Sequence, residues 1–142
     1  MSKSNAAGVL TLALFAGLGT AAAQVAPVAG PTPTPQAPCP VVLGKQAAVN
    51  VDGSAAAVPD CLTVKKNKTT ITWTASADVK TMSITFKDRA TKHPPDDPVC
   101  SGAQCVADKL KLGKVGEFGY GIVVVLQDGT KATNDPKLVI QP

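Results

Sequence analysis

The stretch TTITWTA, residues 69–75, shows most clearly what fold this chain adopts. Its apolar side chains, Ile71, Trp73 and Ala75, alternate with threonines. A second stretch, TMSITFK at residues 81–87, repeats the alternation and places on one side Met82, Ile84 and Phe86. A period of two is what a sheet with one buried and one solvent-exposed face requires. Trp73, the only tryptophan, is expected to anchor the core of such a sheet.

Other segments carry weaker strand patterns and are separated by turn residues: 47–51, 62–64, 110–112, 118–126 and 138–140. Asp52-Gly53 and Asp128-Gly129 predict tight turns. Segment 118–126 is apolar on both faces, which predicts a central strand, whereas the lysines interleaved in 109–112 predict an edge strand. Seven or eight short strands at such spacings predict an all-β, two-sheet sandwich.

The N-terminus has the pattern of a cleavable export signal. Lys3 precedes an apolar run of 14 residues at 6–19, and Ala21 and Ala23 are small residues suited to cleavage after position 23. A permanent anchor is the alternative, but the run is shorter than the roughly 20 residues that span a bilayer. We therefore expect residues 1–23 to be a bacterial-type signal peptide, and the mature protein to be periplasmic or secreted without a transmembrane span.

Residues 24–38, QVAPVAGPTPTPQAP, are rich in proline and predict an extended leader outside the fold. The domain is then expected to span 39–142. Its four cysteines suit disulfides in an oxidising compartment, and three pairings are open. We favour the most local pairing, Cys39 with Cys61 and Cys100 with Cys105. In the chain-entropy description, these two bridges would stabilise the fold by roughly 3 and 2 kcal/mol.

The charge of the chain is mildly positive, with fourteen Lys and Arg against ten Asp and Glu. Removing the signal peptide takes one lysine away and leaves +3. This bias does not predict nucleic-acid binding, which needs clustered basic stripes. The densest run is Lys65, Lys66 and Lys68. A solvated turn and a contact with an acidic cell-surface polymer both explain it.

Several segments together resemble a known group of proteins. These are CLTV at 61–64 before a lysine-rich turn, ITW at 71–73, FGYGIVV at 118–124 and NDPKLVI at 134–140. They resemble a group of small exported proteobacterial proteins of unassigned function. The resemblance covers roughly residues 47–142 and implies an immunoglobulin-like or cupredoxin-like β-sandwich. It supplies no catalytic residue.

Catalytic and metal chemistry find little support in the residue types present. A blue-copper site needs two imidazoles, and His93 is the only histidine. Zinc held by His93, Cys100 and Cys105, with Asp96 or Asp97 as a fourth ligand, competes with a disulfide in an exported protein. Ser101 and His93 lack the G-x-S-x-G setting of a serine hydrolase. We expect no enzymatic activity and no cofactor.

A recognition surface is the remaining prediction. Residues 88–105 read as a long loop stiffened by prolines and a disulfide, which lowers the entropy lost on binding. The candidate binding residues in it are Lys92, His93, Asp96 and Asp97. The expected partner is another protein or a cell-envelope component, with oligomeric state open. Two alternatives stay open: a structural subunit that uses the leader for assembly, and a minor metal-dependent or hydrolytic site in the same loop.

Overall fold

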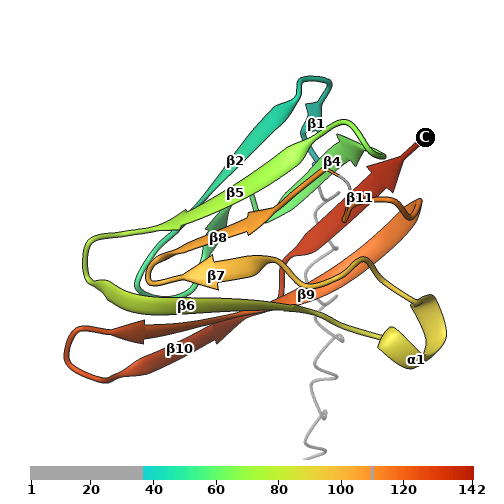
Figure 1. The fold of residues 1–142 in the computed structure, drawn as a ribbon. Coiled ribbons are helices and arrows are strands. Elements are labelled where there is room, and N and C mark those ends of the chain that lie inside the picture. The colour runs from blue at the N-terminus through green and yellow to red at the C-terminus, as the bar shows by residue number, and fades with distance from the viewer. Residues whose placement is uncertain (1–36, 110) are drawn as a thin grey trace, which may run out of the picture. The chain divides into compact units, whose positions relative to one another are not determined.

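The computed structural model describes residues 37–109 and 111–142. The predicted signal peptide and the predicted leader up to residue 36 lie outside the described residues. Among the described residues, the one helix is far too short to cross a membrane. Figure 1 shows the described part as two layers of strands with the short helix α1 (Arg89–Lys92) at one side.

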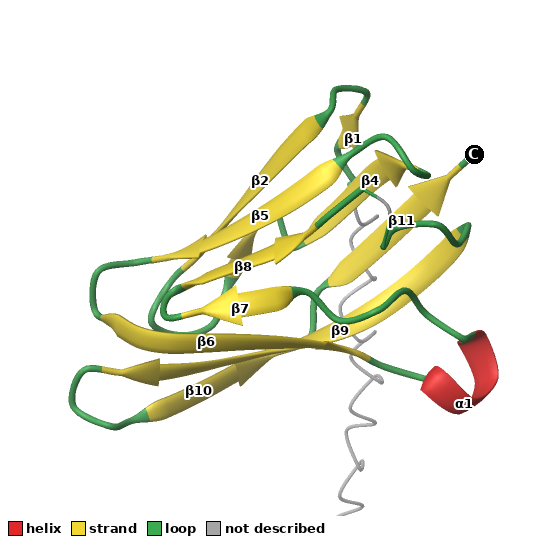
Figure 2. Ribbon diagram, in the orientation of Figure 1, coloured by secondary structure: helices red, strands yellow, loops and turns green. Residues whose placement is uncertain are grey.

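Two mixed sheets pack face to face, and Figure 2 shows that strands make up nearly all of the regular structure. The first sheet holds β1 (Val41–Val42), β4 (Cys61–Lys65), β11 (Lys137–Gln141), β9 (Gly116–Leu126), β10 (Lys131–Asn134) and β6 (Val79–Phe86). The second holds β3 (Ala57–Val58), β2 (Gln46–Val51), β5 (Thr70–Ala75), β8 (Gln104–Ala107) and β7 (Val99–Ser101). The predicted all-β two-sheet sandwich is confirmed, with eleven strands in the described residues instead of seven or eight.

The two alternating stretches form β5 and β6, one in each sheet. In β5, Ile71 and Trp73 are buried while the threonines lie on the outer face. β5 runs parallel to β2 and antiparallel to β8, so it is central in its sheet. β9 is central in the other sheet, because β6 pairs with one edge while β11 and β10 share the other. The prediction that 118–126 forms a central strand is therefore confirmed.

Aromatic side chains form the middle of the core. Trp73 is fully buried and meets Tyr120 edge to face, with ring centroids 5.7 Å apart. Phe86 lies 6.0 Å from Tyr120 and 6.4 Å from Phe118. Edge-to-face pairs of this kind add to the gain from burying the rings. The prediction that Trp73 is a core anchor is confirmed.

Both favoured disulfides are present: Cys39–Cys61 and Cys100–Cys105. The first ties the chain just before β1 to the start of β4. The second joins directly paired residues of the β7–β8 hairpin. Each bridge therefore fastens a short outer strand to a longer neighbour.

The predicted edge strand at 110–112 is wrong. The described residues between β8 and β9 contain no strand, and Leu112 is completely buried. This segment carries the chain from one sheet to the other, so its apolar side chain closes the end of the sandwich instead of pairing along an edge. Leu112 also accepts a hydrogen bond from Asn67 N at its carbonyl oxygen.

The prediction of one long loop over 88–105 is also wrong. The segment contains α1, and its second half is the β7–β8 hairpin at the edge of the second sheet. Strands of three or four residues with mixed burial leave too little alternation to be recognised in the sequence.

Candidate functional site

The four residues of 88–105 that were predicted for recognition differ in exposure and in bonding to the rest of the fold. Lys92, His93 and Asp96 are exposed. Asp97 is tied to the fold, since its Oδ1 accepts a hydrogen bond of 2.7 Å from Phe86 N and forms an ion pair with Arg89. The structure therefore gives Asp97 an internal role that the sequence did not indicate.

The prolines of this segment are buried rather than displayed: Pro94, Pro95 and Pro98. Lys92 faces Asp88 at 3.8 Å within the single turn of α1. The three prolines therefore dock the segment on the sandwich, while residues 88–93 and Asp96 stay exposed.

The residues weighed for metal binding do not converge. Cys100 and Cys105 are joined to each other. No group of three or more His, Cys, Asp or Glu side chains among the described residues is placed to hold a metal ion.

A different cluster of functional groups stands out in three connecting segments. These are residues 43–46, which form the β1–β2 turn and the start of β2, residues 65–68, which form the end of β4 and the β4–β5 turn, and the β8–β9 connection at 108–115, of which residue 110 is not described. We call this region the lysine end. It carries seven lysines: Lys45, Lys65, Lys66, Lys68, Lys109, Lys111 and Lys114. Asp108 is the one carboxylate in these segments.

Strand pairing brings the three segments together. β1, β4 and β11 run parallel, so their C-terminal ends lie at the same end of the sandwich. Figure 1 shows β4 and β11 ending there, beside the C-terminus of the chain. β5 starts next to the start of β2, because Gln46 is in register with Thr70. Residues distant in sequence are thereby placed side by side.

Hydrogen bonds hold the segments in place. Thr70 N donates to the carbonyl of Lys45 at 2.9 Å, and the buried Thr69 Oγ1 donates to the carbonyl of Gly44 at 3.0 Å. Lys109 N donates to Thr70 Oγ1 at 3.3 Å. The backbone that carries these lysines is therefore fixed, although their long side chains reach into solvent.

The lysines of the lysine end differ from the other cations of the described residues in their ion pairing. None of its seven lysines forms an ion pair with any described residue, although four of the six other cations of residues 37–142 do. Those four are Lys87, Arg89, Lys92 and Lys137. The positive charge is therefore concentrated where internal partners are fewest.

Two hollows lie in the lysine end. The larger, about 590 Å³, is lined by nine residues, whose charged members are Lys45, Lys68, Lys109 and Asp108 and which include the exposed Leu43. The smaller, about 290 Å³, lies between Lys111 and Lys114 on one side and Asp96 on the other. Pro94 and Pro95 also line it, so the segment around His93 borders the lysine end.

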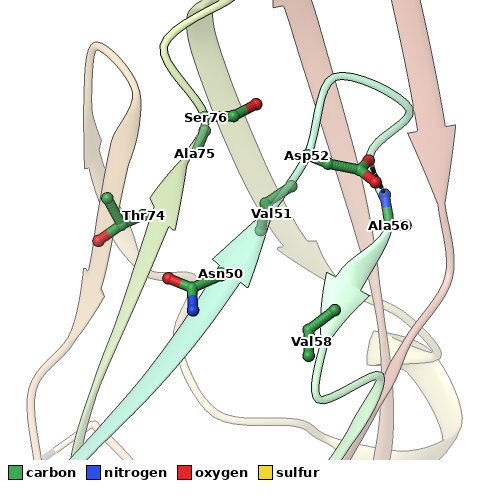
Figure 3. A pocket seen from close by; sticks show the side chains of 8 residues that line it. All are labelled: Asn50, Val51, Asp52, Ala56, Val58, Thr74, Ala75 and Ser76. Carbon is green, nitrogen blue, oxygen red and sulfur yellow. Dashed lines mark hydrogen bonds between the residues drawn. The ribbon is translucent and has the colours of Figure 1, made fainter.

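A third hollow lies at the opposite end of β2 and is drawn in Figure 3. It has a volume of about 330 Å³, and its lining includes Val51, Val58, Ala75 and Asp52. The Asp52 carboxylate is already occupied, because its Oδ1 accepts hydrogen bonds from Ser54 and from Ala56 N. The hydrogen bonds from Ser54 and Ala56 hold the pKa of Asp52 below its ordinary value. This hollow is open and largely apolar, and its one carboxylate already accepts hydrogen bonds from its own turn.

The sequence alone predicted only part of the lysine end. It noted Lys65, Lys66 and Lys68 and gave two explanations for them, but it assigned Lys109 and Lys111 to an edge strand. The signal that could have found the cluster is the position of lysines directly at predicted strand ends. No protein-family model matches the chain, and no curated protein is similar enough in sequence to count as a relative.

Proposed function

We propose that this protein is an exported, non-enzymatic binding module that attaches to a polyanionic component of the cell envelope through its lysine end. The observation that carries this function is the contrast in charge pairing between the lysine end and the rest of the domain. Seven lysines that form no ion pair within residues 37–109 and 111–142 repel one another, so the fold bears an electrostatic cost that an external anion would remove. Clustered cations of this kind also raise the rate of encounter with anionic partners.

The export signal predicted at 1–23 and the two disulfides are consistent with a place of action outside the cytoplasm. The exposed corner at Lys92, His93 and Asp96 borders the lysine end through the smaller hollow. It stays a predicted binding element that would extend the surface, while the lysines supply most of the attraction.

The test is calorimetric titration of the mature domain with dextran sulfate, a soluble polyanion. The variant Lys68→Glu/Lys109→Glu reverses two charges beside the larger hollow. The matched control, Lys80→Glu/Lys131→Glu, has the same net charge, and it alters two exposed lysines outside the lysine end that also lack ion pairs with described residues.

We expect the Lys68/Lys109 variant to lose affinity by at least about tenfold at low salt, because each lysine near a polyanionic surface contributes roughly 1 kcal/mol. The control should lose much less. Raising the salt concentration should weaken binding of the unmodified domain. Equal losses in the two variants would mean that net charge alone matters and would contradict a site at the lysine end.

A further inference from the structure

We infer that the polyanion is an anionic lipid bilayer, on which the lysine end docks with Leu43 and Val115 entering the headgroup region. This inference rests on the proposed function and names its partner. It comes from the position of exposed apolar side chains among the unpaired lysines.

Leu43 is the most exposed large apolar residue of the described chain, at 72 %. It sits in the β1–β2 turn, lines the larger hollow, and shares that hollow with Lys45, Lys68 and Lys109. Val115, 51 % exposed, follows Lys114 directly. A single exposed leucine is common on protein surfaces and needs no explanation. A leucine beside several lysines, however, forms an amphipathic protrusion, which we call a tip.

Strand register sets the spacing of the two apolar residues. Val41 of β1 pairs with Thr63 of β4, and Thr63 pairs in turn with Val139 of β11. Val139 also pairs with Glu117 of β9, so these four residues lie at the same level across the sheet. Three strand spacings, roughly 14 Å, therefore separate the β1 end that carries Leu43 from the β9 start that carries Val115. Lys65 and Lys66 lie between them at the end of β4. Both tips can thus meet one flat surface together with the lysines.

This chemistry fits a lipid surface better than a sugar polymer. Peripheral membrane attachment combines apolar side chains at the headgroup boundary with lysines that face anionic lipids. Flat aromatic side chains suited to stacking on a sugar ring are absent from the described surface. The four aromatic residues of the described chain, Trp73, Phe86, Phe118 and Tyr120, are all buried.

The sole tryptophan allows a direct test. Trp73 is fully buried, so its fluorescence should not respond to a surface event. Leu43→Trp adds a reporter at the proposed contact, and Val58→Trp adds one at a residue of similar exposure, 67 %, beside the third hollow. Each variant is mixed with vesicles of phosphatidylcholine and phosphatidylglycerol, and in parallel with vesicles of phosphatidylcholine alone.

We expect emission from Leu43→Trp to move to shorter wavelength with the anionic vesicles only, and emission from Val58→Trp to stay unchanged. In co-sedimentation, Leu43→Ser should lower vesicle partitioning about five- to tenfold, whereas Val58→Ser should leave it unaltered. An unchanged emission in Leu43→Trp, or equal effects of the two serine variants, would overturn the insertion.

The outcomes separate this inference from the proposed function. Binding to dextran sulfate without binding to anionic vesicles would overturn the lipid partner and leave the polyanion-binding function standing. Binding to neither would overturn both. Vesicle binding that persists in Lys68→Glu/Lys109→Glu would contradict the lysine end as the contact surface.

Discussion

The indole Nε1 of Trp73 donates a 3.2 Å hydrogen bond to the hydroxyl oxygen of Tyr120, and this bond joins the two sheets through the middle of the core. Trp73 belongs to β5 and Tyr120 to β9, the central strands identified above. The only tryptophan and the only tyrosine of the chain are therefore partners. Because each is unique, each is also a specific spectroscopic probe.

Removing the Tyr120 hydroxyl should destabilise the domain. In Tyr120→Phe, the buried indole N–H of Trp73 loses its acceptor, and leaving such a donor unsatisfied costs about 1–3 kcal/mol. Urea unfolding followed by Trp73 fluorescence measures the free energy of unfolding. Thr81→Ala, at an exposed position of β6, is the control and should stay within about 0.5 kcal/mol of the unmodified domain. An unchanged free energy of unfolding in Tyr120→Phe would contradict the proposed importance of this bond.

The Tyr120 hydroxyl should also set an alkaline limit to stability. Burial raises the pKa of Tyr120 to about 12; the hydrogen bond from Trp73 opposes the shift, and the negative charge of Asp60 adds to it. In the unfolded chain the tyrosine pKa is about 10. The unfolded state therefore loses this proton at lower pH than the folded state does. The stabilising contribution is complete below about pH 10 and is lost as pH rises toward about 12.

Two measurements check this alkaline limit. Absorbance of tyrosinate reports Tyr120 alone and should show half-ionisation near pH 12 in the folded domain and near pH 10 in urea. Between pH 10 and pH 12 the free energy of unfolding of the unmodified domain should fall by about 2–3 kcal/mol more than that of Tyr120→Phe. Ionisation near pH 10 in the folded domain would show that the hydroxyl is not buried as described.

Two neighbouring aspartates should behave differently when replaced. Asp97→Ala removes the acceptor of Phe86 N and the partner of Arg89, so we expect a loss of about 1 kcal/mol and increased hydrogen exchange around α1. Asp96→Ala, at an exposed position, should leave the free energy of unfolding within about 0.5 kcal/mol. If neither variant changes the free energy of unfolding, the anchoring role of Asp97 is wrong.

Neutralising lysines of the lysine end should stabilise the isolated domain. Lys68→Gln/Lys109→Gln reduces repulsion among unpaired cations, and we expect a gain of a few tenths to about 1 kcal/mol at low salt. The gain should shrink at high salt because exposed charges are screened. Lys87→Gln/Lys137→Gln, which breaks two ion pairs, should show no such gain. A loss of stability in Lys68→Gln/Lys109→Gln would contradict the proposed electrostatic cost.

The two strands with clear alternation could be predicted from the sequence because their environment is regular. β5 and β6 each have one buried face, and the period of two reveals it. The Cys pairing was favoured correctly because local pairing coincides with a hairpin in one case and with two adjoining segments in the other. Short outer strands such as β1 and β3, with two residues each, carry no periodic signal.

The edge-strand prediction for 110–112 was wrong because Leu112 closes an end of the sandwich, where burial follows three-dimensional position and not strand alternation. The lysine end was not foreseen as one surface for a related reason. Its lysines come from three segments up to roughly 70 residues apart, and the pairings of β1 with β4, of β2 with β5 and of β5 with β8 bring those segments together. Asp97 looked like a surface charge because a bond to the backbone N of Phe86 leaves no trace in the sequence.

The most direct test of the central claim is a nuclear magnetic resonance titration of the isotope-labelled mature domain with dextran sulfate. We predict that amide shifts concentrate in 43–46, 65–70 and 108–115, at the lysine end. The turns containing Asp52, Asp78 and Asp128 should stay unchanged. Shifts centred on those acidic turns, or on 92–97 without the lysine end, would contradict the account.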